Sequence, residues 1–81
     1  MRIDKFLKVS RIIKRRTVAN EACDASHVRV NGKDVKASYD VKVGDIIEIT
    51  FGEKTLKVRV TDVRDVIRKN EAQSLYEVMS E

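Results

Sequence analysis

The sequence has little of what usually stabilises a small protein. Its 81 residues include one Cys, one His, no Pro and no Trp. One Cys cannot form an internal disulfide, and one Cys with one His cannot complete a structural zinc site. A chain of this length forms one domain with a small core. We therefore expect residues 1–81 to be a single domain that folds by packing alone, as suits a reducing cytoplasm.

Long hydrophobic runs are also missing. No apolar stretch approaches the roughly 18 residues that a membrane-spanning helix needs. The charged start lacks the apolar segment and the small-residue cleavage site of a secretory signal peptide. These absences predict a cytoplasmic protein that does not bind a membrane.

Side chains for catalysis are sparse as well. Cys23 lies on a predicted helix face of small residues, where a free Cys usually packs as a small hydrophobe. His27 lies at a predicted strand entry, where it is either a half-exposed loop residue or a phosphate or ribose contact. No acidic residue near the predicted turns has a His beside it, and the glycines are isolated. We predict no enzymatic activity, no cofactor, no metal and no small-molecule substrate.

Positive charge, in contrast, is concentrated. Residues 1–16 contain seven basic residues and one acid, Asp4, for a net charge of +6. The rest of the chain has ten basic and twelve acidic residues, for a net charge of −2. This asymmetry indicates a docking face for a polyanion.

Hydrophobic periodicity predicts where the elements lie. Apolar residues from Ile3 to Ile13 follow helical spacing, with the cations on the opposite arc and Ile12 on the wrong side. Thr17 resembles the N-cap of a second helix from Val18 to about Ala25, and the turn between the helices would expose Lys14, Arg15 and Arg16. Small residues on the second helix would let the two helices pack closely.

Strand-like alternation follows. Val28 to Val35 forms a hairpin around Asn31-Gly32, and strands from Ile46 to Phe51 and from Leu56 to Val60 flank a second turn. Asn70 to Gln73 reads as a capping box for a short final helix reaching Met79. The fold class is therefore α+β: two N-terminal helices packed on a small, mostly antiparallel sheet, with a short C-terminal helix.

The basic helix face has several possible meanings. A solvated face is the commonest fate of charged residues, but such faces usually interleave signs, and like charges at i, i+4 destabilise a helix. Membrane-binding helices need a free apolar face, which this domain requires for its core. Single-stranded nucleic acid is usually gripped by aromatic side chains, and the four aromatics are scattered over predicted core and loop positions. Folded RNA fits best, and charge alone does not exclude duplex DNA.

Several motifs together resemble a known family. They are Arg2-Ile3-Asp4-Lys5-Phe6-Leu7, Ser10-Arg11, Lys14-Arg15-Arg16-Thr17-Val18-Ala19, Val28-Arg29-Val30-Asn31-Gly32, Lys36-Ala37-Ser38 and Val43-Gly44-Asp45. In order and spacing they resemble the RNA-binding domain named after small-subunit ribosomal protein S-four. The resemblance covers about residues 1–51 and implies RNA binding by two helices and their corner.

Among members of this family, the chain resembles the stand-alone proteins of bacterial ribosome-associated quality control. That resemblance implies a partner of large-subunit rRNA and peptidyl-tRNA that supports nascent-chain tailing by a factor of the NEMF/RqcH type. We expect the chain to be a monomer. The alternatives are a ribosome-recycling protein of the fifteen-kilodalton heat-shock type, whose long basic C-terminal extension is missing here, and an RNA-targeting subunit of an RNA-modifying enzyme.

The resemblance and the cationic face together predict the RNA contacts. Arg2 and Arg16 are the strongest candidates, because a guanidinium can clamp phosphate oxygens with two hydrogen bonds. Asp4 is expected to tether Lys8 or Arg11 inside the protein. Asn31 and Ser38 are weaker candidates, since Asn31-Gly32 is equally well explained as a turn. The full predicted set is Arg2, Lys5, Lys8, Arg11, Lys14, Arg15, Arg16, Thr17, Lys33 and Lys36.

Overall fold

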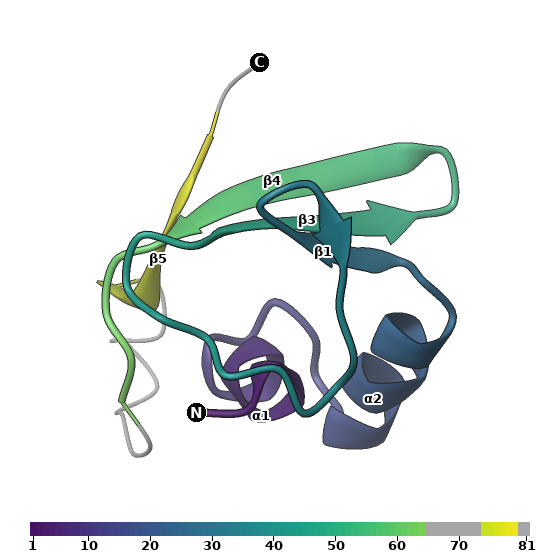
Figure 1. Cartoon of the computed structure of the whole chain (residues 1–81), viewed down its shortest axis with the longest axis horizontal. Helices are drawn as coiled ribbons and strands as arrows, with labels where there is room; N and C mark the ends of the chain where they lie inside the picture. The colour runs from purple at the N-terminus through teal and green to yellow at the C-terminus, as the bar shows by residue number, and fades with distance from the viewer. Residues whose placement is uncertain (65–73, 80–81) are drawn as a thin grey trace.

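Two helices form one layer against a five-stranded antiparallel sheet (Figure 1). The computed structural model describes residues 1–64 and 74–79. The helices are α1 (Ile3–Val9) and α2 (Arg16–Asp24), and the strands are β1 (Val28–Val30), β2 (Lys33–Asp34), β3 (Ile46–Phe51), β4 (Lys54–Val60) and β5 (Tyr76–Val78). The strand order is β2-β1-β3-β4-β5. This arrangement confirms the predicted α+β class.

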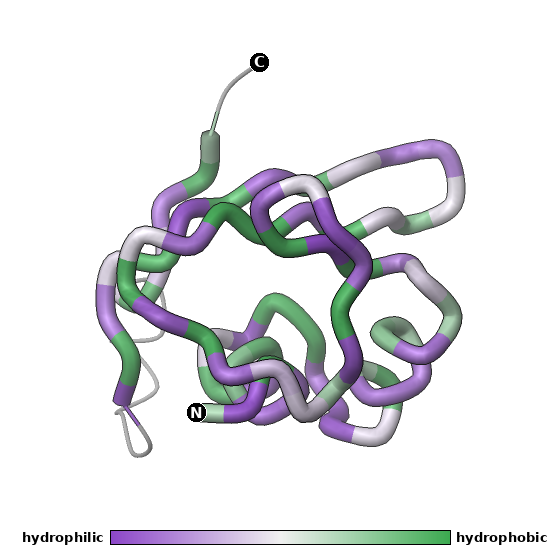
Figure 2. Tube along the Cα trace, in the orientation of Figure 1, coloured by the Kyte–Doolittle hydropathy of each residue, from purple (hydrophilic) through white to green (hydrophobic). Residues whose placement is uncertain are grey.

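The core lies between the sheet and the two helices. Val30, Ile47 and Val58 stand in one row across β1, β3 and β4, and none is more than 3% exposed. From the other layer α1 contributes its fully buried apolar residues, Phe6 and Leu7 among them. Hydrophobic and hydrophilic residues alternate along the strands in Figure 2, as expected for a sheet with one buried face. Burying each large apolar side chain contributes about 1.5–3 kcal/mol.

Tight turns join the strands where the sequence predicts them. Asn31 and Gly32 both have positive φ, 54° and 84°, and they connect Val30 to its register partner Lys33. This conformation is that of a two-residue hairpin turn, for which Asn-Gly is the preferred sequence. The predicted hairpin at Asn31-Gly32 is confirmed.

The first helix ends earlier than its hydrophobic periodicity predicts. Arg11 has a left-handed backbone (φ 64°), so the chain leaves the helix after Val9, with Ser10 as its C-cap. The Arg11 N–H donates to the Lys8 carbonyl, and the Ile13 N–H donates to the Leu7 carbonyl. These carbonyls of the last helical turn therefore still accept hydrogen bonds. Helical periodicity therefore ends at Val9, and the predicted single helix face does not extend to Arg11, Arg15 and Arg16.

The second helix begins at Arg16, so the prediction of Thr17 as its N-cap is wrong. Arg15 holds the N-cap position with an extended backbone and makes no side-chain capping bond. The close packing of the helices is confirmed, with Ala19 and Cys23 buried, although Ala25 is exposed.

The predicted C-terminal helix is wrong over the part that the structure describes. Tyr76–Val78 is strand β5, paired antiparallel with β4 through Tyr76↔Val60 and Val78↔Val58. The predicted capping box at residues 70–73 lies outside the described residues. Leu75, just before β5, is fully buried, and its carbonyl accepts from the Thr61 N–H at 2.9 Å. For this segment, the hydrogen bonds and packing gained by pairing with the edge of β4 outweigh the helical preference of the local sequence. Within residues 1–64 and 74–79, neither helix has the length and apolarity to cross a membrane.

Candidate nucleic-acid interface

A buried carboxylate holds together two arginines from different elements. Asp4, in the first turn of α1, is 2% exposed. Arg2 Nη2 donates to its Oδ2 at 3.2 Å, and Arg16 Nη2 donates to its Oδ1 at 3.5 Å. Arg2 precedes α1 and Arg16 begins α2, so Asp4 connects the starts of both helices.

Further donors complete the environment of Asp4. Asn20 Nδ2 donates to its Oδ2 at 3.4 Å, and the Lys5 backbone N–H donates to its Oδ1 at 2.7 Å. Burial raises the pKa of Asp4, but the hydrogen bonds from Asn20 and Lys5 and the charge of Arg16 outweigh it, so the pKa is lowered overall. Asp4 is thus an ionised internal anchor for basic side chains, as the sequence predicts. The predicted partners, Lys8 and Arg11, are wrong, since Arg2, Arg16 and Asn20 take their place.

Both anchored arginines keep a solvent-facing side. Their side chains are 50% and 45% exposed for Arg2 and Arg16. Each uses Nη2 for Asp4, and a guanidinium carries five N–H donors in a planar fork. The remaining donors have the geometry for bidentate contact with phosphate oxygens. A shallow depression beside Arg16 is lined by Asp4, Thr17, Asn20 and Glu21, which places Thr17 next to the anchor.

Four more cations belong to the two helices and the segment that joins them. Lys8 lies in the last turn of α1, Arg11 and Lys14 lie in the connection between the helices, and Arg15 caps α2. All four are exposed, and none forms an ion pair within residues 1–64 and 74–79. Lys5 is half-buried on α1. Lys14, Arg15 and Arg16 form the basic corner, confirmed as exposed.

The basic corner coincides with the start of α2. That helix has no acidic residue in its first turn and no side-chain cap. Cations at a helix N-terminus are locally unfavourable, because the helix dipole already makes this end positive. An external anion would relieve this repulsion, and the first-turn amides would point toward it.

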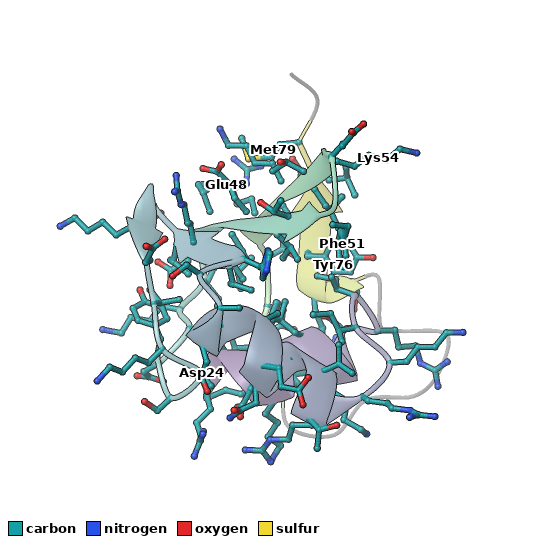
Figure 3. The ribbon with its side chains drawn as sticks, turned by 90° about the vertical axis from the view of Figure 1, so that its right-hand side faces the viewer. Asp24, Glu48, Phe51, Lys54, Tyr76 and Met79 are labelled. Carbon is teal, nitrogen blue, oxygen red and sulfur yellow. The ribbon has the colours of Figure 1, made fainter. Side chains whose placement is uncertain are left out.

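The outer face of the sheet has the opposite character. Arg29 Nε donates to Asp34 Oδ1 at 3.1 Å, and Arg59 Nη2 donates to Glu77 Oε1 at 2.9 Å. Glu48, labelled in Figure 3, lies between Arg29 and Lys57 in the strand register. Charges of both signs therefore alternate across the strands. In Figure 3 many nitrogen-tipped side chains extend from the helical layer, away from the sheet.

The hairpin-side candidates lie at the border of this cluster or outside it. Lys36 precedes Ala37, whose carbonyl accepts from the Asp4 N–H at 3.3 Å, so its loop lies beside the start of α1. Lys33 belongs to β2 in the sheet layer. Asn31 has a structural role, because its Oδ1 accepts from the Ile46 N–H at 3.0 Å and its Nδ2 donates to Asp45. Asp45 also accepts from the Tyr39 hydroxyl at 3.1 Å, so its carboxylate helps to hold the turn at Gly44-Asp45.

The two residues considered for catalysis differ in exposure. Cys23 is buried, and burial, followed by the charges of Asp4 and Asp24, raises the pKa of its thiol to about 11. A neutral, buried thiol supports its assignment to the core. His27 is exposed, and its backbone joins α2 to the sheet through Ala22 and Thr50. In the described part of the chain, no three His, Cys, Asp or Glu side chains are placed to hold a metal.

Sequence reasoning missed Asn20 as a site residue. Its contact with Asp4 joins two residues that are 16 positions apart in the chain. The contact exists because the two helices pack together, so local sequence contains no signal for it.

Known proteins share both this fold and these motifs. Residues 1–47 match the model of the S4 domain. The trimeric heat shock protein 15 of Vibrio cholerae superposes with a TM-score of 0.91 at 30% identity, covering 99% of this chain and 82% of that one. A heat shock protein 15 homolog of Haemophilus influenzae is 30% identical in an alignment that covers 95% of this chain and 60% of that protein. Fold and helix corner thus define an S4-domain protein.

Identity over the full length narrows the assignment. An RQC P-site tRNA stabilizing factor of Halalkalibacterium halodurans is 53% identical over all 81 residues and is covered to 92% of its own length. The chain belongs to the family of RQC P-site tRNA stabilizing factors.

Proposed function

We propose that this chain is a non-enzymatic, cytoplasmic and monomeric factor that binds large-subunit rRNA and peptidyl-tRNA. By holding the tRNA in place, it supports nascent-chain tailing by a factor of the NEMF/RqcH type. The whole chain acts as one RNA-binding domain. The observation that carries this proposal is the anchoring of Arg2 and Arg16 on Asp4, together with Lys8, Arg11, Lys14 and Arg15, which form no ion pair within the described residues.

The geometry suits contact with folded RNA. Arginines fixed by a buried carboxylate lose less conformational freedom on binding than free side chains, so their donors are preorganised for phosphate oxygens. The flexible Lys8, Lys14 and Arg15 add charge around them. The relatives are named P-site tRNA stabilizing factors, and the phosphates of a tRNA are groups that such a surface would contact. The RNA contacts proposed are those of the predicted set, with Arg2 and Arg16 at the centre.

Substitution of the anchored arginines tests this interface. Arg2→Ala and Arg16→Ala should each weaken cosedimentation with large ribosomal subunits carrying peptidyl-tRNA, by about tenfold for a charge-assisted contact worth about 1.5 kcal/mol. Arg59→Ala is the matched control, because Arg59 is similarly exposed but pairs with Glu77 on the outer sheet face. Normal cosedimentation of both site variants would refute the interface.

The heat-shock-type function is the second candidate, favoured by the structural likeness to heat shock protein 15. The two functions predict different effects of gene deletion on nascent-chain tailing. Deleting the gene should abolish C-terminal tailing of stalled nascent chains if the first proposal holds. Unchanged tailing, with large subunits that accumulate peptidyl-tRNA, would favour the recycling role instead.

A further inference from the structure

The β3–β4 hairpin ends in an aromatic side chain that the core leaves largely exposed. Phe51, the last residue of β3, is 48% exposed, whereas Ile47 and Ile49 on the same side of that strand are fully buried. Figure 1 shows the hairpin extending beyond the helical layer on the side of α2, and Figure 3 labels Phe51 at this end of the sheet. Core packing therefore does not account for a phenylalanine at this position.

A lysine lies beside Phe51. Lys54 is its direct partner in the ladder, which places their Cβ atoms about 4.5–5.5 Å apart on the same face of the sheet. Lys54 and Glu53, which precedes it in the turn, line a depression that reaches Val78 on β5. Lys57 also lines this depression, but it pairs with Glu48 in the register and so belongs to the outer face. Lys54 forms no ion pair within residues 1–64 and 74–79.

This combination favours nucleic acid over protein as the ligand. Protein interfaces are depleted in Lys, and an apolar anchor there is usually surrounded by other apolar groups. Nucleic-acid surfaces instead combine aromatic faces that stack on bases with cations that follow the backbone. The sequence places Phe51 at a strand end without revealing its exposure, so only the fold shows that an aromatic is available.

We propose that the hairpin tip is a second RNA contact, in which Phe51 stacks on an unpaired base and Lys54 contacts a phosphate of the same strand. This inference rests on the proposed function, because it assumes an RNA ligand. The molecule measures 29 × 28 × 20 Å. One RNA molecule could therefore contact both the tip and the basic corner.

Substitutions at the tip separate stacking from charge. With large subunits carrying peptidyl-tRNA as the probe, Phe51→Leu should weaken binding at least about fivefold, whereas Phe51→Trp should bind like the parent chain. Lys54→Gln should reduce the slope of log affinity against log salt by about 0.7–1, and Phe51→Leu should leave that slope unchanged. Val43→Ala is the control, because Val43 is 63% exposed outside the hairpin. Thermal unfolding should be unchanged for all four variants.

The outcomes distinguish this inference from the proposed function. Normal binding by Phe51→Leu, together with weak binding by Arg16→Ala, would overturn the tip contact alone. Normal binding by Phe51→Leu, Arg2→Ala and Arg16→Ala would overturn both. A benzoyl-phenylalanine photocrosslinker at position 51 should attach to RNA, and attachment only to protein would refute the tip contact even if Phe51→Leu binds weakly.

Discussion

Asp4 is the residue whose chemistry the proposed interface depends on. Its carboxylate accepts from Arg2, Arg16, Asn20 and the Lys5 N–H, so one buried charge sets the positions of two half-exposed arginines. Because the arginines remain solvated, the local dielectric is high and each ion pair by itself contributes little. The hydrogen bonds to a buried acceptor carry most of the stabilisation.

Replacing Asp4 should affect both stability and binding. We expect Asp4→Asn to lower the free energy of unfolding by about 1–3 kcal/mol at neutral pH, since it removes charge-assisted hydrogen bonds. RNA binding should weaken too, because Arg2 and Arg16 lose their common anchor. Urea unfolding and subunit cosedimentation measure the two effects. Asp34→Asn, which breaks the exposed pair with Arg29, should change neither by much.

The lowered pKa of Asp4 predicts that the free energy of unfolding depends on pH. The pKa of Asp4 is lower in the folded chain than its ordinary value of 3.8, so the unfolded chain binds the proton more tightly. The stabilisation from Asp4 is therefore complete above about pH 4–5 and is lost as the pH falls through the folded pKa. Urea unfolding between pH 2 and 7 should show a shallower loss of stability in Asp4→Asn than in the parent chain. Parallel pH profiles would contradict this assignment.

At the scale of elements, the end of α1 decides where the basic residues lie. Arg11 has a left-handed backbone at a position where helices usually end in Gly. Its conformation allows Ile12 and Ile13 to turn back toward the core, where Ile13 is buried. The outlying position of Ile12 on the predicted helix was the one sign of this early end. Without Gly or Pro nearby, the sequence contains no conventional stop signal.

An exchange of Arg11 for Gly should separate folding from binding. A non-Gly residue with a left-handed backbone costs about 1–2 kcal/mol of folding free energy. Gly avoids this cost, but its more flexible unfolded chain takes back about 0.5–1 kcal/mol of the gain. Arg11→Gly should therefore raise the free energy of unfolding by about 0.5–1 kcal/mol in urea titrations while it weakens RNA binding. Arg11→Ala retains the strain and loses the charge, so it should bind as weakly as Arg11→Gly without the gain in stability.

For the whole molecule, charge is divided between two surfaces. The outer sheet face pairs its own charges, as Arg29 with Asp34 and Arg59 with Glu77 show, whereas several cations of the helical layer form no ion pair in the part of the chain that the structure describes. A net charge of +4 therefore understates the local field at the basic corner. A one-sign surface of this kind both steers a polyanion toward the protein and makes its binding sensitive to salt.

Salt dependence tests the charge of the whole interface. If about five phosphates are neutralised, log affinity for the large subunit should fall with log salt at a slope of roughly −3.5 to −4.5. Binding titrations between about 50 and 300 mM salt would measure it. Arg59→Ala should retain the slope of the parent chain, and a slope near zero in the parent would mean that the cationic surface is not the contact.

Periodic patterns were sufficient to predict the fold class, the hairpin at Asn31-Gly32 and the exposed basic corner, because each depends on residues close together in the chain. The end of α1 at Arg11, the strand at Tyr76–Val78 and the grouping of Arg2, Arg16 and Asn20 on Asp4 were not predictable in this way. Each of these depends on a long-range partner: the core that Ile13 enters, the open edge of β4, and the packing of α2 on α1. Local propensities differ by about 1 kcal/mol or less, so burial and ladder hydrogen bonds override them wherever the tertiary structure supplies both.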